Sequence, residues 1–299
     1  MFQAVIVPLD GAELAEAALP YARALAAKLG AGLTLVSVLG DGASASDERQ
    51  MQAYLAEQAG KLGPGRVDVS LRLGDPVKQI VAASQEHEDA VVVMASQHEH
   101  GLSGLFHSSV AAQVVHDSRV PVLVVRAAPT PTGAVNFARI LVPLDGSAFA
   151  ERALPVAEEL AHAFDAELQL VRVAAVTQLY ALSSGSAIEP GAPAAMAEMS
   201  DELIDAARDF IAEKVEQVRG EGYRVQGEAL IGDPANQIIS FAADRQSDLI
   251  VMATHGQGGL MRFLFGSVAK HMLDNATTPL LLVHPTGKVE EETRAQEPG

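Results

Sequence analysis

The 299-residue chain contains no cysteine and no tryptophan. The absence of cysteine excludes a disulfide framework, a thiolate nucleophile and a cysteine-ligated metal site. Aromatic residues make up only 4% of the chain. The cores are therefore expected to consist of Val, Leu, Ile and Ala, as in parallel sheets covered by helices. The length suffices for two domains of ordinary size.

Basic residues are scarce, and the formal net charge is −17. An acidic surface repels the phosphates of nucleic acids and anionic lipids, so we expect neither nucleic acid nor a membrane as a partner. The start of the sequence has no basic, apolar leader, and no apolar stretch reaches the roughly 18 residues that span a bilayer. These absences lead us to expect a cytoplasmic protein.

An internal repeat is the strongest signal in the sequence. The run AVIVPLDG at 4–11 returns as RILVPLDG at 139–146, an offset of 135. The run LGDP at 73–76 returns as IGDP at 231–234, an offset of 158. The chain therefore consists of two copies of one unit, and the second copy carries 158 − 135 = 23 additional residues between its second and third strands.

Each copy alternates apolar runs with helical stretches and ends on an apolar run. This alternation indicates βαβ units and a parallel sheet covered on both faces, an α/β fold. In the first copy, strands are expected near 3–8, 32–39, 67–73, 90–95 and 121–126, and helices near 12–29, 47–61, 75–87 and 108–118. In the second copy, strands are expected near 138–143, 167–174, 223–231, 248–253 and 279–284.

We predict a first domain over 1–127, a linker over 128–137, a second domain over 138–285 and a solvated tail over 286–299. The linker is short and contains proline, so it should hold the two copies near each other. The additional residues of the second copy fall around 175–199 and are rich in Ala, Ser, Gly and Pro. This composition predicts a long loop, either a lid over a site or a disordered insertion.

Two segments of the second copy are expected to meet beyond the carboxyl ends of the strands, where ligands of open parallel sheets bind. One is 142–147, after the first strand. The other is 252–268, which contains three closely spaced glycines and leads into the last helix at Gly266 and Ser267. Glycine leaves no Cβ between backbone and ligand, and the N–H groups of a helix N-terminus form an anion site. The residues alone support a phosphate cradle and a tight loop with a serine cap equally well.

The chain resembles tandem universal stress proteins, the two-domain bacterial type of the UspA-like family, over nearly all of both copies. The opening Val-Pro-Leu-Asp-Gly-Ser, the Gly-Asp-Pro after the third strand and the final Thr-Pro-Leu-Leu-Leu-Val carry the resemblance. ATP-binding members resemble Gly-x2-Gly-x9-Gly-(Ser/Thr). The second copy matches this spacing with Ala253, Gly256, Gly266 and Ser267, so alanine replaces the first glycine.

The resemblance implies two tandem flavodoxin-like (adenine nucleotide alpha hydrolase-like) domains. Each would have a five-stranded parallel sheet of order 3-2-1-4-5, and the copies would pair through their last strands. It also implies a site for ATP, with or without magnesium, in the second copy. Asp145 would face the ribose or a phosphate-bound metal, and Val173 would pair with adenine through its backbone. The complete set of expected nucleotide-binding residues is Pro143, Asp145, Val173, Met252, Ala253, Gly256, Gly266, Ser267 and Val268.

In the first copy, the counterparts of the two phosphate-loop glycines are His98 and Ser108. A Cβ at each position should block the approach of the backbone to a phosphate. The first copy is therefore predicted to be a degenerate partner that binds no nucleotide or binds one weakly. His98, His100 and His107 leave a zinc site open as an alternative to an exposed polar loop, although their spacing is not a familiar ligand pattern.

No pattern in the chain argues strongly for catalysis. It has no Gly-x4-Gly-Lys-(Ser/Thr) loop and no nucleophile elbow at a strand end. Asp145 and Asp233 could hold a metal or a water, or Asp233 could cap the helix behind Gly232. The main prediction is an ATP-binding stress-response regulator rather than an enzyme. The alternatives are a slow ATPase and a scaffold or chaperone-like protein with a vestigial site. Expected protein contacts are copy-to-copy pairing within the chain and a homodimer.

Overall fold

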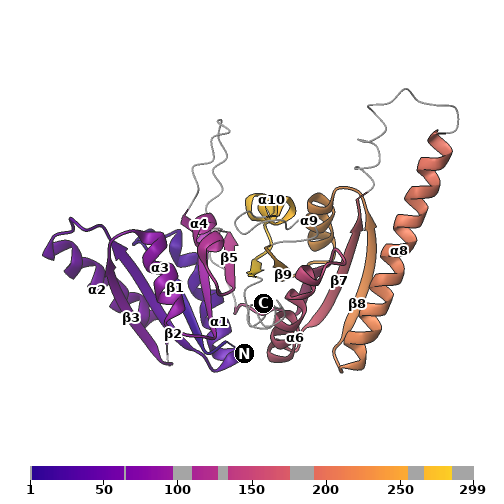
Figure 1. The fold of residues 1–299 in the computed structure, drawn as a ribbon. Helices are drawn as coiled ribbons and strands as arrows, with labels where there is room; N and C mark the ends of the chain where they lie inside the picture. The colour runs from indigo at the N-terminus through magenta and orange to yellow at the C-terminus, as the bar shows by residue number, and fades with distance from the viewer. Residues whose placement is uncertain are drawn as a thin grey trace, which may run out of the picture. The chain divides into compact units, whose positions relative to one another are not determined.

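The computed structural model describes residues 2–63, 65–96, 110–126, 134–175, 192–254 and 266–284, with the backbone alone for 192–198. The chain divides into two compact units, and the colours of Figure 1 follow the residue number, from indigo at the N-terminus to yellow at the C-terminus. The first unit extends to residue 136 and includes the strand at 280–283. The second begins at residue 137 and includes the helix at 267–275.

The first unit contains five parallel strands in the order β3-β2-β1-β4-β5. These strands are β1 (Ala4–Pro8), β2 (Gly32–Leu39), β3 (Val67–Leu73), β4 (Ala90–Ser96) and β5 (Val122–Arg126). The helical elements that connect them are η1 (Ala15–Ala18), α1 (Leu19–Leu29), α2 (Ala45–Lys61), α3 (Pro76–Gln85) and α4 (Val110–Asp117). A further strand, β10 (Leu280–Val283), pairs antiparallel with β5, with Leu281 opposite Leu123. The last strands of the two sequence copies therefore pair with each other, as the resemblance implies.

The second unit contains four parallel strands in the order β8-β7-β6-β9. These strands are β6 (Arg139–Pro143), β7 (Glu167–Ala174), β8 (Val225–Ile231) and β9 (Leu249–Ala253). The helices are α5 (Ala148–Glu151), α6 (Ala153–Phe164), α8 (Ala192–Gly220), α9 (Pro234–Asp244) and α10 (Ser267–Asn275). In Figure 1, α8 runs beside β8, and it contacts both β7 and β8. The predicted α/β fold, built from parallel strands and connecting helices, is confirmed.

Two details of the predicted helices are wrong. The single helix expected over 12–29 is divided into η1 and α1, because Pro20 lies in the first turn of α1. The loop expected over 175–199 is wrong in its last part, because α8 already begins at Ala192. Ala, Met and Glu dominate 192–199 and are strong helix formers, and Pro193 lies in the first turn, where proline is tolerated.

The cores are aliphatic, as the composition requires. Among the largest fully buried side chains of the described residues, Phe137 is the one aromatic, and its ring packs against Phe164 with 4.9 Å between centroids. A polar pair is also buried in the second unit: the Ser247 hydroxyl donates to the Gln169 side-chain oxygen at 2.6 Å. None of the helices described here is long and apolar enough to cross a bilayer.

Glu158 on α6 gives the second unit a pH-dependent stability. Its pKa is raised, first because burial penalises the charged form and second because Glu221 is close. The folded state therefore binds this proton more tightly than the unfolded state does, so stability falls as the pH rises from the usual glutamate pKa through the raised value. We expect Glu158→Gln to raise the melting temperature at pH 7. The corresponding gain in the free energy of unfolding should be less than about 1 kcal/mol, because solvent screens a half-buried group.

The measurement is thermal unfolding of both proteins between pH 4 and pH 8, followed by circular dichroism. Glu213→Gln on the exposed face of α8 is the matched control for the loss of one carboxylate. A lower melting temperature for Glu158→Gln at pH 7 would contradict the assignment of a charge penalty to Glu158.

Candidate functional site

Three strands of the second unit end at one edge of the sheet. Pro143 ends β6 and is paired with Val171 of β7. The next residue, Leu144, donates its backbone N–H to the Val171 carbonyl at 2.8 Å. Met252 and Ala253 end β9, which is the other parallel neighbour of β6. The structure therefore brings these predicted site residues to the same edge.

The turn after β6 is closed by Asp145. Its carboxylate accepts the backbone N–H of Ser147 at 2.9 Å, and the intervening Gly146 has a φ of +84°. The left-handed region that contains this angle favours glycine. The Ser147 hydroxyl then accepts the N–H of Ala150 at 3.1 Å and caps α5. Asp145 thus lies at the edge of the sheet in a defined conformation and is itself part of the turn.

Val173 lies beyond the end of β6. The last paired residue of β6 faces Val171, so β7 extends further, and Val173 is paired only with Leu230 of β8 in the strand register. Its side chain is half-buried. The Val173 backbone is therefore next to the Asp145 turn at the strand ends.

The last helix begins beside the end of β9. The Gly266 N–H donates to the Thr254 carbonyl at 3.0 Å, which ties the start of α10 to the residue after β9. Gly266 is the N-cap residue and makes no side-chain cap hydrogen bond. Ser267 is exposed and Val268 is half-buried. An anion can therefore take the place of the missing cap at the first turn of α10.

Several predicted positions lie outside the described residues: Gly256, His98, His100, His107 and Ser108. The metal alternative for the three histidines is untested for this reason. Within the part of the chain that is described, no group of three or more potential ligands is placed to hold a metal ion.

Asp233, the second carboxylate considered for a metal or a water, caps a helix. Its side chain accepts the N–H of Asn236 at 3.0 Å, and Asp233 is the N-cap of α9. Asp75 does the same for α3 in the first unit, where it accepts the N–H of Lys78 at 2.9 Å. The repeated Gly-Asp-Pro therefore has a structural explanation in both copies.

The corresponding turn of the first unit has the same backbone but different surroundings. Asp10 accepts the N–H of Ala12 at 2.9 Å, and Gly11 has a φ of +85°. A Cβ on Gly11 would lie 3.5 Å from the Met51 methyl group of α2. Tyr54, also on α2, lines the same small cavity of about 360 Å³. Side chains of α2 therefore lie over the Asp10 turn.

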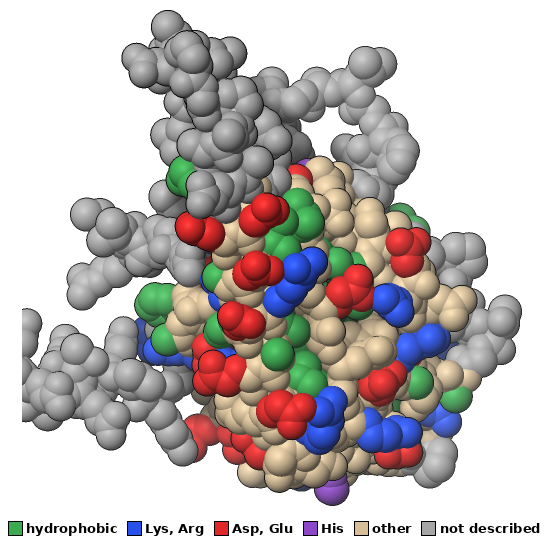
Figure 2. Space-filling view, turned by 90° about the vertical axis from the view of Figure 1, so that its right-hand side faces the viewer, with side chains coloured by type: hydrophobic (Ala, Val, Ile, Leu, Met, Phe, Trp, Pro, Cys, Tyr) green, Lys and Arg blue, Asp and Glu red, His purple; other side chains and the backbone are tan. Residues whose placement is uncertain are grey.

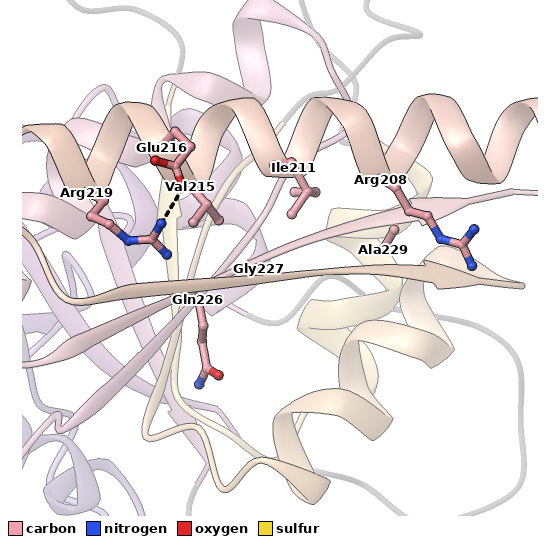
Figure 3. Close-up of a pocket in the computed structure, with 9 residues that line it drawn as sticks. Arg208, Ile211, Val215, Glu216, Arg219, Gln226, Gly227 and Ala229 are labelled. Carbon is pink, nitrogen blue, oxygen red and sulfur yellow. Dashed lines mark hydrogen bonds and ion pairs between the residues drawn. The ribbon is translucent and has the colours of Figure 1, made fainter.

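A groove of about 520 Å³ lies between α8 and β8. Figure 3 shows Ile211 and Val215 pointing from α8 toward the strand, and Gln226 pointing away from the helix. Arg219 is paired with Glu216 at its edge, and Figure 2 shows acidic and basic side chains mixed over this face of the molecule. Of the predicted site residues that the structure describes, none lines the groove. We assign it to the packing of α8 rather than to a ligand.

Sequence analysis missed Arg172, which lies in β7 immediately before Val173. Three atoms of its guanidinium group lie 3.2–3.3 Å from the position that a Cβ on Gly146 would occupy. The available signal was a charged residue near the carboxyl end of the mainly apolar run 168–174.

The model of the universal stress protein family matches residues 1–126 and 136–284. The chain belongs to the universal stress protein family and contains two copies of its domain, so the predicted family and tandem arrangement are confirmed.

Individual relatives agree with this assignment. A universal stress protein of Methanocaldococcus jannaschii is 34% identical over 148 residues, which cover 49% of this chain and 82% of that protein. One of Mycolicibacterium smegmatis is 25% identical over 240 residues, 79% of this chain and 75% of that protein. The crystal structure of a universal stress protein from Archaeoglobus fulgidus has a TM-score of 0.71 at 22% identity and covers 95% of this chain and 98% of its own. This last likeness supports the fold.

Proposed function

We propose that the chain is a stress-response regulator that binds one adenine nucleotide, ATP, in its second unit. One observation carries the proposal: the Asp145 turn and the N-terminus of α10 lie at the ends of the adjacent strands β6 and β9. Membership of the universal stress protein family supports a role in the response to stress.

The Asp145 turn offers hydrogen-bond acceptors and the first turn of α10 offers donors. The Asp145 carboxylate is an acceptor, which suits ribose hydroxyls or a phosphate-bound cation. The first turn of α10 supplies backbone N–H donors and the positive end of a helix dipole, and Ser267 adds an exposed hydroxyl. A nucleotide that spans from β6 to α10 would place its sugar on the acceptor side and its phosphates on the donor side. Local donors of this kind are needed because a chain of net charge −17 repels phosphate at long range.

The direct test is to denature the purified full-length protein and identify the released small molecules by mass spectrometry. We expect about one adenine nucleotide per chain, as one site in the second unit requires. Two nucleotides per chain would contradict the prediction that the first copy is degenerate. No nucleotide, even after incubation with ATP and magnesium, would exclude the proposal and leave the scaffold as the remaining function.

Incubation with ATP, AMP and cyclic AMP in separate samples identifies the preferred nucleotide. The same samples report hydrolysis. A slow ATPase would release phosphate in a way that Asp145→Ala abolishes, whereas a regulator that only binds ATP would leave the nucleotide intact.

A further inference from the structure

Arg172 lies between α8 and the turn that contains Asp145. Its guanidinium carbon is 4.6 Å from the centroid of the Phe210 ring, a side chain of α8. The same group lies against Gly146, 3.2–3.3 Å from the position of a Cβ there. A side chain at position 146 would meet the guanidinium and would also be strained by the φ of +84°. Arg172 therefore covers the Asp145 turn on the side that faces α8.

The Arg172 guanidinium lies over the face of the Phe210 ring. Among the described residues, none forms an ion pair or a side-chain hydrogen bond with this half-buried guanidinium. A cation over an aromatic face is attracted by the negative face of the ring. The guanidinium is planar and always charged, so it places both a flat packing face and a positive charge next to the Asp145 turn.

A second contact joins α8 to the same segment. Lys214 lies one helical turn after Phe210 and donates to the Glu151 carboxylate of α5 at 2.7 Å. Its Nζ is also 5.8 Å from the Phe210 ring centroid. Residues four positions apart share a helix face, so one face of α8 reaches the segment 146–151 at two places, through Arg172 at Gly146 and directly at Glu151.

Among its described residues, the first unit retains one of these two contacts. Glu16 accepts hydrogen bonds from Tyr54 at 3.1 Å and from Gln58 at 2.9 Å, which tie α2 to η1. The position of Arg172 is occupied by Ser37, whose buried hydroxyl has no hydrogen-bond partner among the described residues. The copy that is predicted to be degenerate thus lacks the cation, and the copy with the candidate site has it.

We propose that Arg172 is a positioning residue of the nucleotide site: with Phe210 it holds the Asp145 turn in the conformation that meets the ligand. This inference rests on the proposed function, because the ligand of Asp145 is the proposed nucleotide. Arg172 acts through the turn, so its effect on affinity depends on the presence of the Asp145 carboxylate.

The test is a double-mutant cycle on ATP affinity, measured by calorimetry on the full chain with the variants Arg172→Met, Asp145→Ala and the pair. Methionine keeps the apolar stem and removes the charge and the plane. We expect Arg172→Met to weaken ATP binding about tenfold, and to have no further effect once Asp145 is alanine. A merely structural role would give additive losses.

Arg245→Met is the matched control. Arg245 also lies over a phenylalanine ring, Phe241 at 5.4 Å, but it belongs to α9 and is paired with Glu228. It should leave ATP affinity unchanged. An equal loss in Arg245→Met, or additive losses in the cycle, would overturn the positioning role.

Hydrogen exchange of the ligand-free protein tests Arg172 without ATP. We expect Arg172→Met, and not Arg245→Met, to accelerate exchange of the Ser147 and Ala150 amides, which bond to the Asp145 and Ser147 side chains. Unchanged exchange would overturn the inference even if the wild type binds ATP. Faster exchange in a protein that binds no nucleotide would instead refute the proposed function and leave Arg172 as a support of the turn.

Discussion

Replacing Gly266 with glutamate is expected to lower the affinity for ATP by at least about 30-fold. Two unit charges about 4 Å apart interact with about 4 kcal/mol at an effective dielectric constant of about 20, and half of that still corresponds to about 30-fold in affinity. The new carboxylate would lie at the N-cap of α10, where the phosphates are proposed to bind. The measurement is calorimetric titration with ATP and magnesium, together with the nucleotide released on denaturation.

The variant should remain folded. Gly266 has φ −58° and ψ 144°, a conformation open to any residue. A negative charge at a helix N-terminus is also favourable for the helix itself. Gly266→Gln has the same shape without the charge and is the matched control. The Cβ of either side chain should hinder the approach of a phosphate, so the glutamine variant is expected to lose part of the affinity, and the further loss in the glutamate variant measures the charge. If the glutamine variant binds ATP as weakly as the glutamate variant, the loss of affinity comes from the size of the side chain and not from its charge. Full ATP binding by Gly266→Glu would exclude the α10 N-terminus as the phosphate site.

Replacing Gly227 with alanine is expected to destabilise the second unit by about 1–3 kcal/mol, the usual cost of an overpacked core. A Cβ at this position of β8 would lie 2.4 Å from a methyl group of Ile211 and 2.6 Å from one of Val215. Both side chains are branched at Cβ and therefore stiff in a helix. They cannot move aside, so α8 must shift away from β8. Urea denaturation followed by circular dichroism measures the loss, and hydrogen exchange over 207–218 locates it.

Gly220→Ala is the control for this change. Gly220 is the last residue of α8, and no heavy atom lies within 4 Å of a Cβ built there. The same substitution should be neutral or stabilise by a few tenths of a kcal/mol. If Gly227→Ala were as stable as Gly220→Ala, the close approach of α8 to β8 would not exist in solution.

The strands were predictable because most are apolar runs with clear boundaries, whereas 67–73 alternates apolar and polar residues. The runs at 32–39, 67–73 and 167–174 became β2, β3 and β7 without a change of boundary. The start of α8 was not predictable in this way, because 175–199 as a whole is rich in Ala, Ser, Gly and Pro. The helix-forming residues of 192–199 were concealed by the Ser, Gly and Pro residues that precede them.

The candidate site was predictable only where its chemistry is local. The turn at Asp145 and the helix start at Gly266 follow from neighbouring residues, since an aspartate before a glycine closes a turn and a glycine can precede a helix. Arg172 depends on Phe210, which lies 38 positions later and across the segment that differs in length between the copies. No spacing rule connects them, because the contact arises from how α8 packs on β7 and β8.

The pairing of β5 with β10 sets an order of assembly. Leu123 is opposite Leu281, 158 positions further along the chain. During synthesis the first unit therefore emerges with β5 as an open edge, and the strand that covers this edge appears only after the second copy has been made. An uncovered apolar strand is a template for pairing with other chains. The unit that is synthesised first is thus completed last. Its sheet stays open at β5 until the second copy has been synthesised and β10 can pair with it.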